Sequence, residues 1–267
     1  GALDDRLYRA PEDLSWEEKV HICKQVSSGM GYLHSKSLYH RDLKPANVLI
    51  GADGSAKIAD FGLSKQGDSD GEDKSSTSTQ RAGITGFFKK KQAKEAQAAH
   101  TEHDYMTANV GTPAYMAPEA MVPFGGSYTG VTQYDGALAD VYSFGLLMWS
   151  TLACAKPYER MVRQRRLNLW DLRDLVLRGL RPPVDSSMVL QRGGCPPAAL
   201  KLMEQCWEGK PEDRPGSFDE VLSRLGAALR MLKRREEEED SADKLLADMD
   251  LDGDEEDEVE MHEVEVV

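Results

Sequence analysis

The chain has 267 residues, of which 40% are hydrophobic and 30% are charged. This length and apolar content are enough to build a sizeable core, which excludes a wholly disordered chain and a coiled coil. Four cysteines are scattered without a CxxC pair, which argues against a disulfide scaffold and a zinc knuckle. No apolar run is long enough to cross a bilayer. We therefore expect an intracellular, cytoplasmic protein without membrane partners, and the nucleus is not excluded.

The net charge of −13 is concentrated near the C-terminus. Residues 236–267 hold seventeen acidic residues and one lysine, so residues 1–235 carry a net charge of +3. Dense like charges with few apolar residues predict a disordered acidic tail, which we place at 233–267. Asp248, Asp250 and Asp252 imitate the opening of a calcium-binding loop, but Val259 stands where such a loop needs a glutamate. The solvated tail is therefore the favoured interpretation.

In chain order, the first predicted element is an amphipathic helix over 16–36, which begins with a capping box formed by Ser15 and Glu18. Two short apolar runs follow, at 47–50 and 57–59. The turn between them contains two glycines, so the pair predicts a small β-hairpin.

The next segment, 66–104, is rich in Ser, Thr, Lys and Gly and predicts a polar insertion. Beyond it the pattern is helical. An almost continuous apolar run at 141–155 predicts a buried helix. Further helices are expected over 167–178, 197–207 and 217–235. The predicted fold class is α+β, mainly helical with one small hairpin.

Two polar segments frame the hairpin. The sequence HRDLKPAN occupies 40–47, and DFG occupies 60–62. Together they present Asp42, Lys44, Asn47 and Asp60. Magnesium prefers carboxylate and amide oxygens, an acceptor hydroxyl needs a carboxylate to take its proton, and a transferring phosphate needs a nearby cation. These four side chains fill those roles.

These two segments and the sequence GTPAYMAPE at 111–119 occur in an order that resembles the eukaryotic protein kinase family. The resemblance spans about 1–232 and implies the mainly helical C-terminal lobe of that fold, with ATP and Mg²⁺ as cofactors. It implies that Asp42 is the catalytic base and that Lys44 contacts the transferring phosphate. It also implies that Asn47 and Asp60 hold magnesium and that Leu49 helps to bind the nucleotide.

Other residues match positions that hold the family's fold together. Asp140 resembles the residue whose carboxylate holds the backbone of the catalytic loop. Arg214 resembles the partner of Glu119 in a structural ion pair. The remaining structural matches are His40, Phe61 and Gly62.

The resemblance also indicates which hydroxyl is phosphorylated. This chain has Lys-Pro-Ala at 44–46, where tyrosine kinases usually carry an Ala-Ala-Arg type of sequence. Thr112 resembles the threonine that contacts both the catalytic base and its loop in serine/threonine kinases. The stretch ADVYSFG at 139–145 resembles the tyrosine-kinase-like group, whose members are mostly serine/threonine kinases. We therefore expect protein substrates that are phosphorylated on Ser or Thr, and no nucleic-acid partner.

Regulation by phosphorylation is expected within the activation segment. Arg41 places a cation where a phosphorylated residue can dock, and Thr107 is the first candidate. The hydroxyls at 75–79 are alternatives, although a flexible linker explains them equally well. The modifying enzyme is either an upstream kinase or the protein itself. His100 and His103 are more simply interpreted as unliganded than as a metal site.

The sequence before residue 40 lacks two features that are typical of the family. It has no glycine-rich loop and no lysine-bearing strand ahead of the catalytic loop. We therefore expect the N-terminal lobe to be absent from these residues and the isolated chain to have little activity. The alternative is a catalytically silent kinase lobe that serves as a binding or scaffold module.

Overall fold

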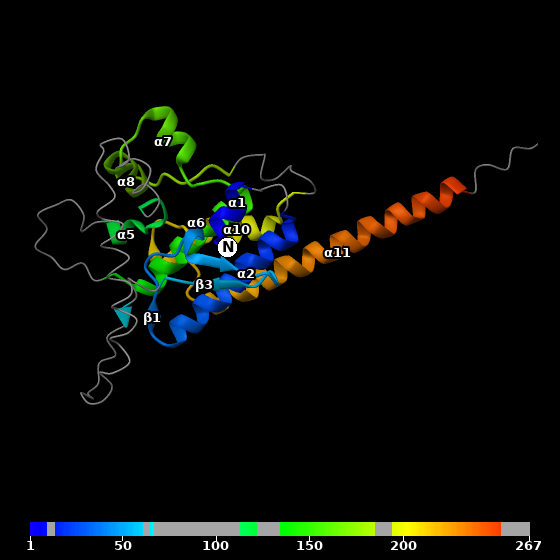
Figure 1. The fold of residues 1–267 in the computed structure, drawn as a ribbon, viewed down its shortest axis with the longest axis horizontal. Coiled ribbons are helices and arrows are strands. Elements are labelled where there is room, and N and C mark those ends of the chain that lie inside the picture. Colours follow the sequence, from blue (N-terminus) through cyan, green and yellow to red (C-terminus); the bar gives the residue numbers. More distant parts are fainter. Residues whose placement is uncertain (10–13, 61–64, 67–112, 122–133, 185–193, 252–267) are drawn as a thin grey trace, which may run out of the picture. The chain divides into compact units, whose positions relative to one another are not determined.

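A computed structural model describes residues 1–9, 14–60, 65–66, 113–121, 134–184 and 194–251 (Figure 1). The chain divides into two compact units, Gly1–Leu229 and Arg230–Val267. Among the described residues of the first unit, helices surround one small hairpin. No described helix is both long enough and apolar enough to cross a membrane.

Helix α2, Trp16–Ser35, begins as its sequence predicts. The Ser15 side chain accepts the backbone N–H of Glu18, and the Glu18 carboxylate accepts the N–H of Ser15, which forms the predicted capping box. Val20, Cys23 and Met30 recur on one face and are fully buried. The prediction of an amphipathic helix is therefore confirmed.

Strands β2, Val48–Ile50, and β3, Ala56–Ile58, pair in antiparallel fashion and confirm the predicted hairpin. The turn closes because the N–H of Gly51 donates to the carbonyl of Ser55 at 2.8 Å. Gly54 adopts a φ of 76°, which a residue with a Cβ rarely adopts. Gly1 and Ile50 exchange hydrogen bonds at 3.0 and 2.8 Å, so the first residues extend this small sheet.

Helix α6, Gly136–Ala153, is buried along most of its length. It packs against α2 and α10, Pro197–Cys206, and forms the centre of the core (Figure 1). Gly145 allows the close approach of α10, because a Cβ built there would lie 2.9 Å from the Cβ of Cys206. The predicted buried helix is thus confirmed and begins five residues before the expected start at 141.

Helices α8, Leu169–Leu177, and α10 confirm two further predictions. Several short elements were not predicted, because two to seven residues give too little periodicity to detect. They are α1, Leu3–Arg9; η2, Pro45–Asn47; η3, Pro113–Tyr115; α5, Pro118–Met121; α7, Glu159–Arg165; and η5, Pro211–Asp213. Strands β1, Leu38–Tyr39, and β4, Lys65–Gln66, pair with each other and were also missed. Gln66 therefore ends a strand and does not begin the polar insertion.

Helix α11, Phe218–Leu251, extends well beyond the expected end at 235. The structure thus differs from the disordered tail that we predicted from charge, as far as Leu251. Extending an existing helix needs no new nucleus, and Glu, Lys, Leu, Ala and Met are good helix formers. Arg235 and Glu239 also form an ion pair one turn apart at 3.4 Å. The rest of the acidic tail, with the calcium-like sequence from Asp252 onward, lies outside the described residues.

Candidate active site

His40 begins the polar loop 40–44 and is completely buried. Its ring nitrogen Nδ1 lies 3.3 Å from the backbone nitrogen of Asp42 and accepts that N–H. The ring proton therefore resides on Nε2, which donates to the carbonyl oxygen of Ala59 at 3.1 Å. The imidazole thus ties the loop before the hairpin to the residue that directly precedes Asp60.

Asp140 holds the backbone of the same loop from the first turns of α6. Its side chain is fully buried. One carboxylate oxygen accepts the N–H of His40 at 2.8 Å, and the other accepts the N–H of Arg41 at 2.7 Å. This is the contact that the resemblance implied for Asp140.

Asp42 lies at the centre of the loop with its carboxylate in a fixed orientation. Its Oδ2 accepts Lys44 Nζ at 2.7 Å and Asn47 Nδ2 at 3.1 Å. The Asn47 amide also donates to the backbone carbonyl of Asp42 at 2.7 Å. The other carboxylate oxygen, Oδ1, is buried and has no hydrogen-bond partner among the residues that the structure describes. Three of the four predicted side chains are therefore in direct contact.

The backbone of Ala59 holds the neighbouring residue Asp60 at the end of the hairpin where Asn47 lies. The N–H of Ala59 donates to the carbonyl of Asn47 at 2.8 Å, while its own carbonyl accepts the His40 ring. Asp60 is exposed and has a φ of 63°, and Arg41 has a φ of 65°. A left-handed conformation in a residue with a Cβ costs about 1 kcal/mol or more, and it recurs at functional sites.

Asn47 and Asp60 form a donor set that suits a hard cation. The Asn47 amide nitrogen is engaged by Asp42, so the amide oxygen is the atom that remains for a metal ion. Magnesium is typically held by one or two carboxylates together with substrate phosphates and water. A single exposed carboxylate and one amide oxygen fit that pattern. No group of three or more His, Cys, Asp or Glu residues that could hold a metal occurs in the described part of the chain.

Arg41 extends from the loop toward Tyr134. Its guanidinium carbon lies 5.9 Å from the centre of the Tyr134 ring. Its Nε is buried without a hydrogen-bond acceptor among the described residues. A guanidinium with an unused N–H donor can bind an anionic group.

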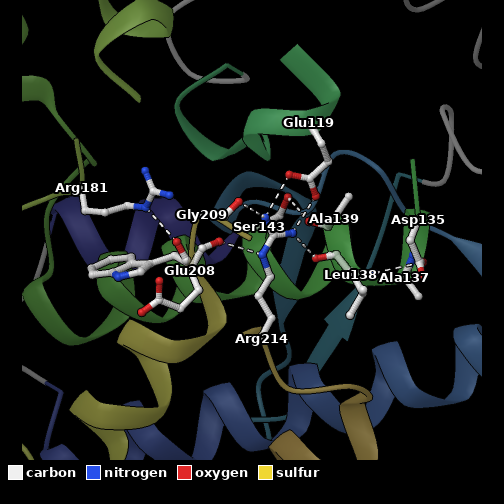
Figure 2. Close-up of polar contacts among 11 residues, drawn as sticks. Glu119, Asp135, Ala137, Leu138, Ala139, Ser143, Arg181, Glu208, Gly209 and Arg214 are labelled. Atoms are coloured by element: carbon white, nitrogen blue, oxygen red, sulfur yellow. Dashed lines mark hydrogen bonds and ion pairs between the residues drawn. The ribbon is translucent and has the colours of Figure 1, made fainter. Parts of the chain in front are cut away.

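Glu119 and Arg214 form a bidentate ion pair at 2.6 and 2.9 Å, as Figure 2 shows. The Arg214 side chain is fully buried and stacks over Tyr142, with 5.0 Å between the guanidinium carbon and the ring centre. It also donates to three backbone carbonyls on two segments, that of Leu138 on α6 and those of the adjacent residues Glu208 and Gly209. Arg214 thus connects the segment after the insertion to α6 and to the chain before η5.

Of the remaining predicted site residues, the structure describes only Leu49. Leu49 lies on β2 between two buried residues and is 46% exposed. Its side chain therefore faces away from the core, as a nucleotide-contacting residue requires. Four predicted residues lie outside the described residues: Phe61, Gly62, Thr107 and Thr112.

Two sets of contacts were missed from the sequence. His34, on the last turn of α2, shares Asp140 with the catalytic loop, with Nε2 lying 2.9 Å from Oδ2. Tyr115 lies 2.9 Å from the Ser150 hydroxyl and 3.4 Å from the Tyr8 hydroxyl, and burial raises the pKa of Tyr115 well above its usual value. Each set joins residues from distant segments, so no local spacing could indicate it.

Comparisons with known proteins show the family of this chain. The sequence profile of the protein kinase domain matches residues 1–224. A probable LIM domain-containing serine/threonine-protein kinase of Dictyostelium discoideum is 32% identical over 225 residues. Another probable serine/threonine-protein kinase of that organism is 32% identical over 206 residues. Human receptor-interacting serine/threonine-protein kinase 1 is 30% identical over 197 residues.

These matches cover most of this chain but a small part of each relative. They span 84%, 77% and 74% of the chain, in the order given above. They span 26%, 11% and 24% of the corresponding relatives. The similarity therefore concerns one domain of longer proteins.

Proposed function

Because this chain belongs to the protein kinase domain family, we propose that it supplies the phosphoryl-transfer residues of a serine/threonine protein kinase. The reaction moves the γ-phosphate of ATP to a Ser or Thr hydroxyl of a protein substrate. Asp42 receives the hydroxyl proton, and Lys44 neutralises charge on the transferring phosphate.

The observation that carries this proposal is the hydrogen bonding of the Asp42 carboxylate. Lys44 and Asn47 fix its Oδ2, while Oδ1 has no partner among the described residues. A general base needs one fixed orientation and one free lone pair directed at the proton that it removes. A buried carboxylate oxygen without a partner is costly in a purely structural residue, which supports a role in catalysis.

Asn47 and Asp60 are the residues that we propose to hold Mg²⁺. When bound, the ion neutralises charge on the phosphates of ATP and orients them for in-line transfer. The hydrogen bonds of Ala59 to Asn47 and His40 support this pairing, because they fix the backbone beside Asp60. The exposed Leu49 is proposed to contact the nucleotide.

Specificity for Ser and Thr is supported by the sequence at 44–46 and by the names of the similar proteins. Thr112 is proposed to contact the base and its loop. Arg41, whose Nε has no acceptor among the described residues, is proposed to bind phosphorylated Thr107. The modification would come from an upstream kinase or from autophosphorylation.

We further propose that residues 1–267 alone transfer phosphate slowly. Their sequence contains neither a glycine-rich loop nor a lysine-bearing strand ahead of the catalytic loop. The same feature favours one alternative function, a silent kinase lobe that binds other proteins. Retention of Asp42, Lys44, Asn47 and Asp60 favours the enzyme. We propose a cytoplasmic location, with protein substrates as the partners.

The test is an assay of γ-phosphate transfer to a protein substrate by the full natural polypeptide, followed by identification of the phosphorylated residue. We expect phosphoserine and phosphothreonine. We also expect Asp42→Asn to lower kcat by about 10² to 10⁴ while nucleotide affinity is kept. Lys201→Gln, at an exposed position of α10, serves as the control and should leave kcat unchanged. No measurable transfer by the wild type would favour the silent module.

A further inference from the structure

Helix α8 has apolar side chains on two opposite faces. Leu172 and Val176 are buried and attach the helix to the core. Trp170 and Leu177 lie on the other face, with 53% and 40% of their surfaces exposed. Seven positions make almost two turns, so these two side chains lie about 10 Å apart along one line of the helix.

The exposed pair is not needed to form the helix. The Asn168 side chain accepts the N–H groups of Trp170 and Asp171, and Asp171 completes the capping box. The ends and the inner face of α8 are therefore already fixed. An exposed Trp that shares a helix face with an exposed Leu lowers solubility without stabilising the fold, and such faces often mark interaction surfaces.

The surroundings of this face are basic. Residues 159–178 hold six arginines and three acidic residues, a net charge of +3. Arg173 pairs with Asp174 at 3.2 Å and stacks on Trp170, with 6.0 Å between the guanidinium carbon and the ring centre. Arg165 and Arg166 are exposed and form no ion pair with any residue that the structure describes. Both lie within five residues of Trp170, where α7 ends and α8 begins.

The inner face of α8 contacts the segment that follows the insertion. It packs against η3 and α5, which lie on the same side of the core in Figure 1. The Arg173 Nε donates to the carbonyl of Met121, the last residue of α5, at 3.3 Å. This segment includes Glu119 and ends the proposed activation segment. A ligand on α8 would therefore bind a helix that contacts the end of the proposed activation segment.

We propose that the outer face of α8, together with Arg165 and Arg166, docks an acidic segment of the protein substrate that carries two large apolar side chains. The inference rests on the proposed function, because it specifies the class of substrate. Trp170 and Leu177 bind the apolar side chains, whose spacing of two helical turns matches their own. The arginines attract the acidic residues and increase the rate of association.

A single-stranded nucleic acid fits this surface less well. Glu159, Asp171 and Asp174 are interspersed among the arginines and would repel phosphates. Nucleic-acid channels usually combine several aromatic rings with an uninterrupted basic groove. An acidic peptide can instead place its own apolar and charged side chains between these groups.

The test measures binding of a fluorescently labelled peptide to residues 1–267 in the absence of nucleotide. The probe has about 16 residues, with two leucines two helical turns apart among glutamates. A matched peptide has lysine in place of every glutamate. The acidic peptide should bind and the lysine peptide should not. We expect Trp170→Ala to weaken binding by about tenfold or more, and Arg165→Gln with Arg166→Gln to weaken it and reduce its salt dependence.

Tyr32→Ala is the matched control, because Tyr32 is an exposed aromatic residue of α2 with Lys36 Nζ located 5.8 Å from its ring centre. It should leave the affinity unchanged. Failure of the acidic peptide to bind, or equal binding by the Trp170 variant, would overturn the proposal. So would tighter binding of a single-stranded oligonucleotide that depends on the same arginines, or self-association that depends on Trp170. None of these outcomes depends on phosphate transfer, so the proposed function is tested separately.

Discussion

At the scale of single residues, the position of the loop at 40–44 depends on the Asp140 carboxylate, which lies one hundred positions from His40. It accepts two backbone N–H groups and also contacts His34. Because the N–H of His40 is buried and that of Arg41 is partly buried, the carboxylate stabilises both the fold and the geometry of Asp42. The loop is thus held by a residue that lies far from it in the sequence.

Replacing Asp140 by Ala should lower the free energy of unfolding by about 3 kcal/mol, because the buried N–H of His40 and the partly buried N–H of Arg41 lose their acceptor. Urea unfolding followed by circular dichroism measures this loss. The control is Asp135→Ala, which removes the exposed N-cap of the same helix and should cost about 1 kcal/mol. Equal losses for the two variants would show that Asp140 acts as an ordinary cap.

Replacing Glu119 by Gln should lower the free energy of unfolding by about 3 kcal/mol, because the charge of Arg214 then stays buried without a counter-ion. Thermal or urea unfolding measures the effect. Glu159→Gln is the matched control, since Glu159 pairs with Arg163 on an exposed helix at 2.9 Å and should contribute less than about 1 kcal/mol. A loss as small as that of the control would contradict the structural role of the pair.

Sequence reasoning at this scale grouped Asp42, Lys44 and Asn47 as side chains suited to phosphoryl transfer, and the resemblance to protein kinases implied the role of each. The structure brings the three side chains into contact. Tyr134, which lies under Arg41, was not identified. A tyrosine near a loop has no distinctive neighbours in the sequence, so its position follows only from the packing of α6 against the loop.

At the scale of elements, the long helices α2, α6 and α10 were predictable because each has a repeating apolar face or a capping signal. Strands β1 and β4 were not, because each has two residues and 25 residues lie between them. The continuation of α11 was missed for a different reason. The composition indicated repulsion among its glutamates, but it did not show that a helix already precedes them along the chain.

The approach of α10 to α6 supplies a prediction at this scale. Gly145→Ala should lower the free energy of unfolding by about 1 to 3 kcal/mol, because the new methyl group would meet the Trp207 nitrogen at 3.1 Å and the Met203 oxygen at 3.2 Å. These are backbone atoms, which cannot rotate away. Gly216→Ala is the control, since a Cβ there meets no atom within 4 Å. Denaturant unfolding should show no loss of stability in the control, and the same result for Gly145→Ala would show that the two helices can separate without cost.

At the scale of the whole molecule, buried tyrosines and cysteines make the free energy of unfolding depend on pH in the alkaline range. Burial raises the pKa of the Cys23 thiol from 9.0 to about 12 and that of Tyr142 from 10.0 to about 12. In the unfolded chain these groups lose their protons near pH 9 and 10, while the folded chain keeps them. The unfolded state then binds fewer protons, so the free energy of unfolding decreases as pH rises through this range.

We therefore expect the free energy of unfolding to change little between about pH 7 and 8 and to fall between about pH 9 and 12. Urea unfolding at a series of pH values measures the slope. In Cys23→Ala the slope should be smaller above about pH 9, because one titrating group is gone. A stability that is independent of pH in this range would contradict the burial of these side chains.

The central claim for the molecule is that the loop containing Asp42 and the residue Asp60 act on one phosphate and its metal ion. Phosphate transfer by the full natural polypeptide, measured for Asp42→Asn, for Asp60→Asn and for the double variant, tests this claim most directly. Residues that act as a unit have strongly non-additive effects on kcat. We predict that the double variant is about as slow as the slower single variant. A double variant whose loss in kcat equals the product of the two single losses would contradict the claim.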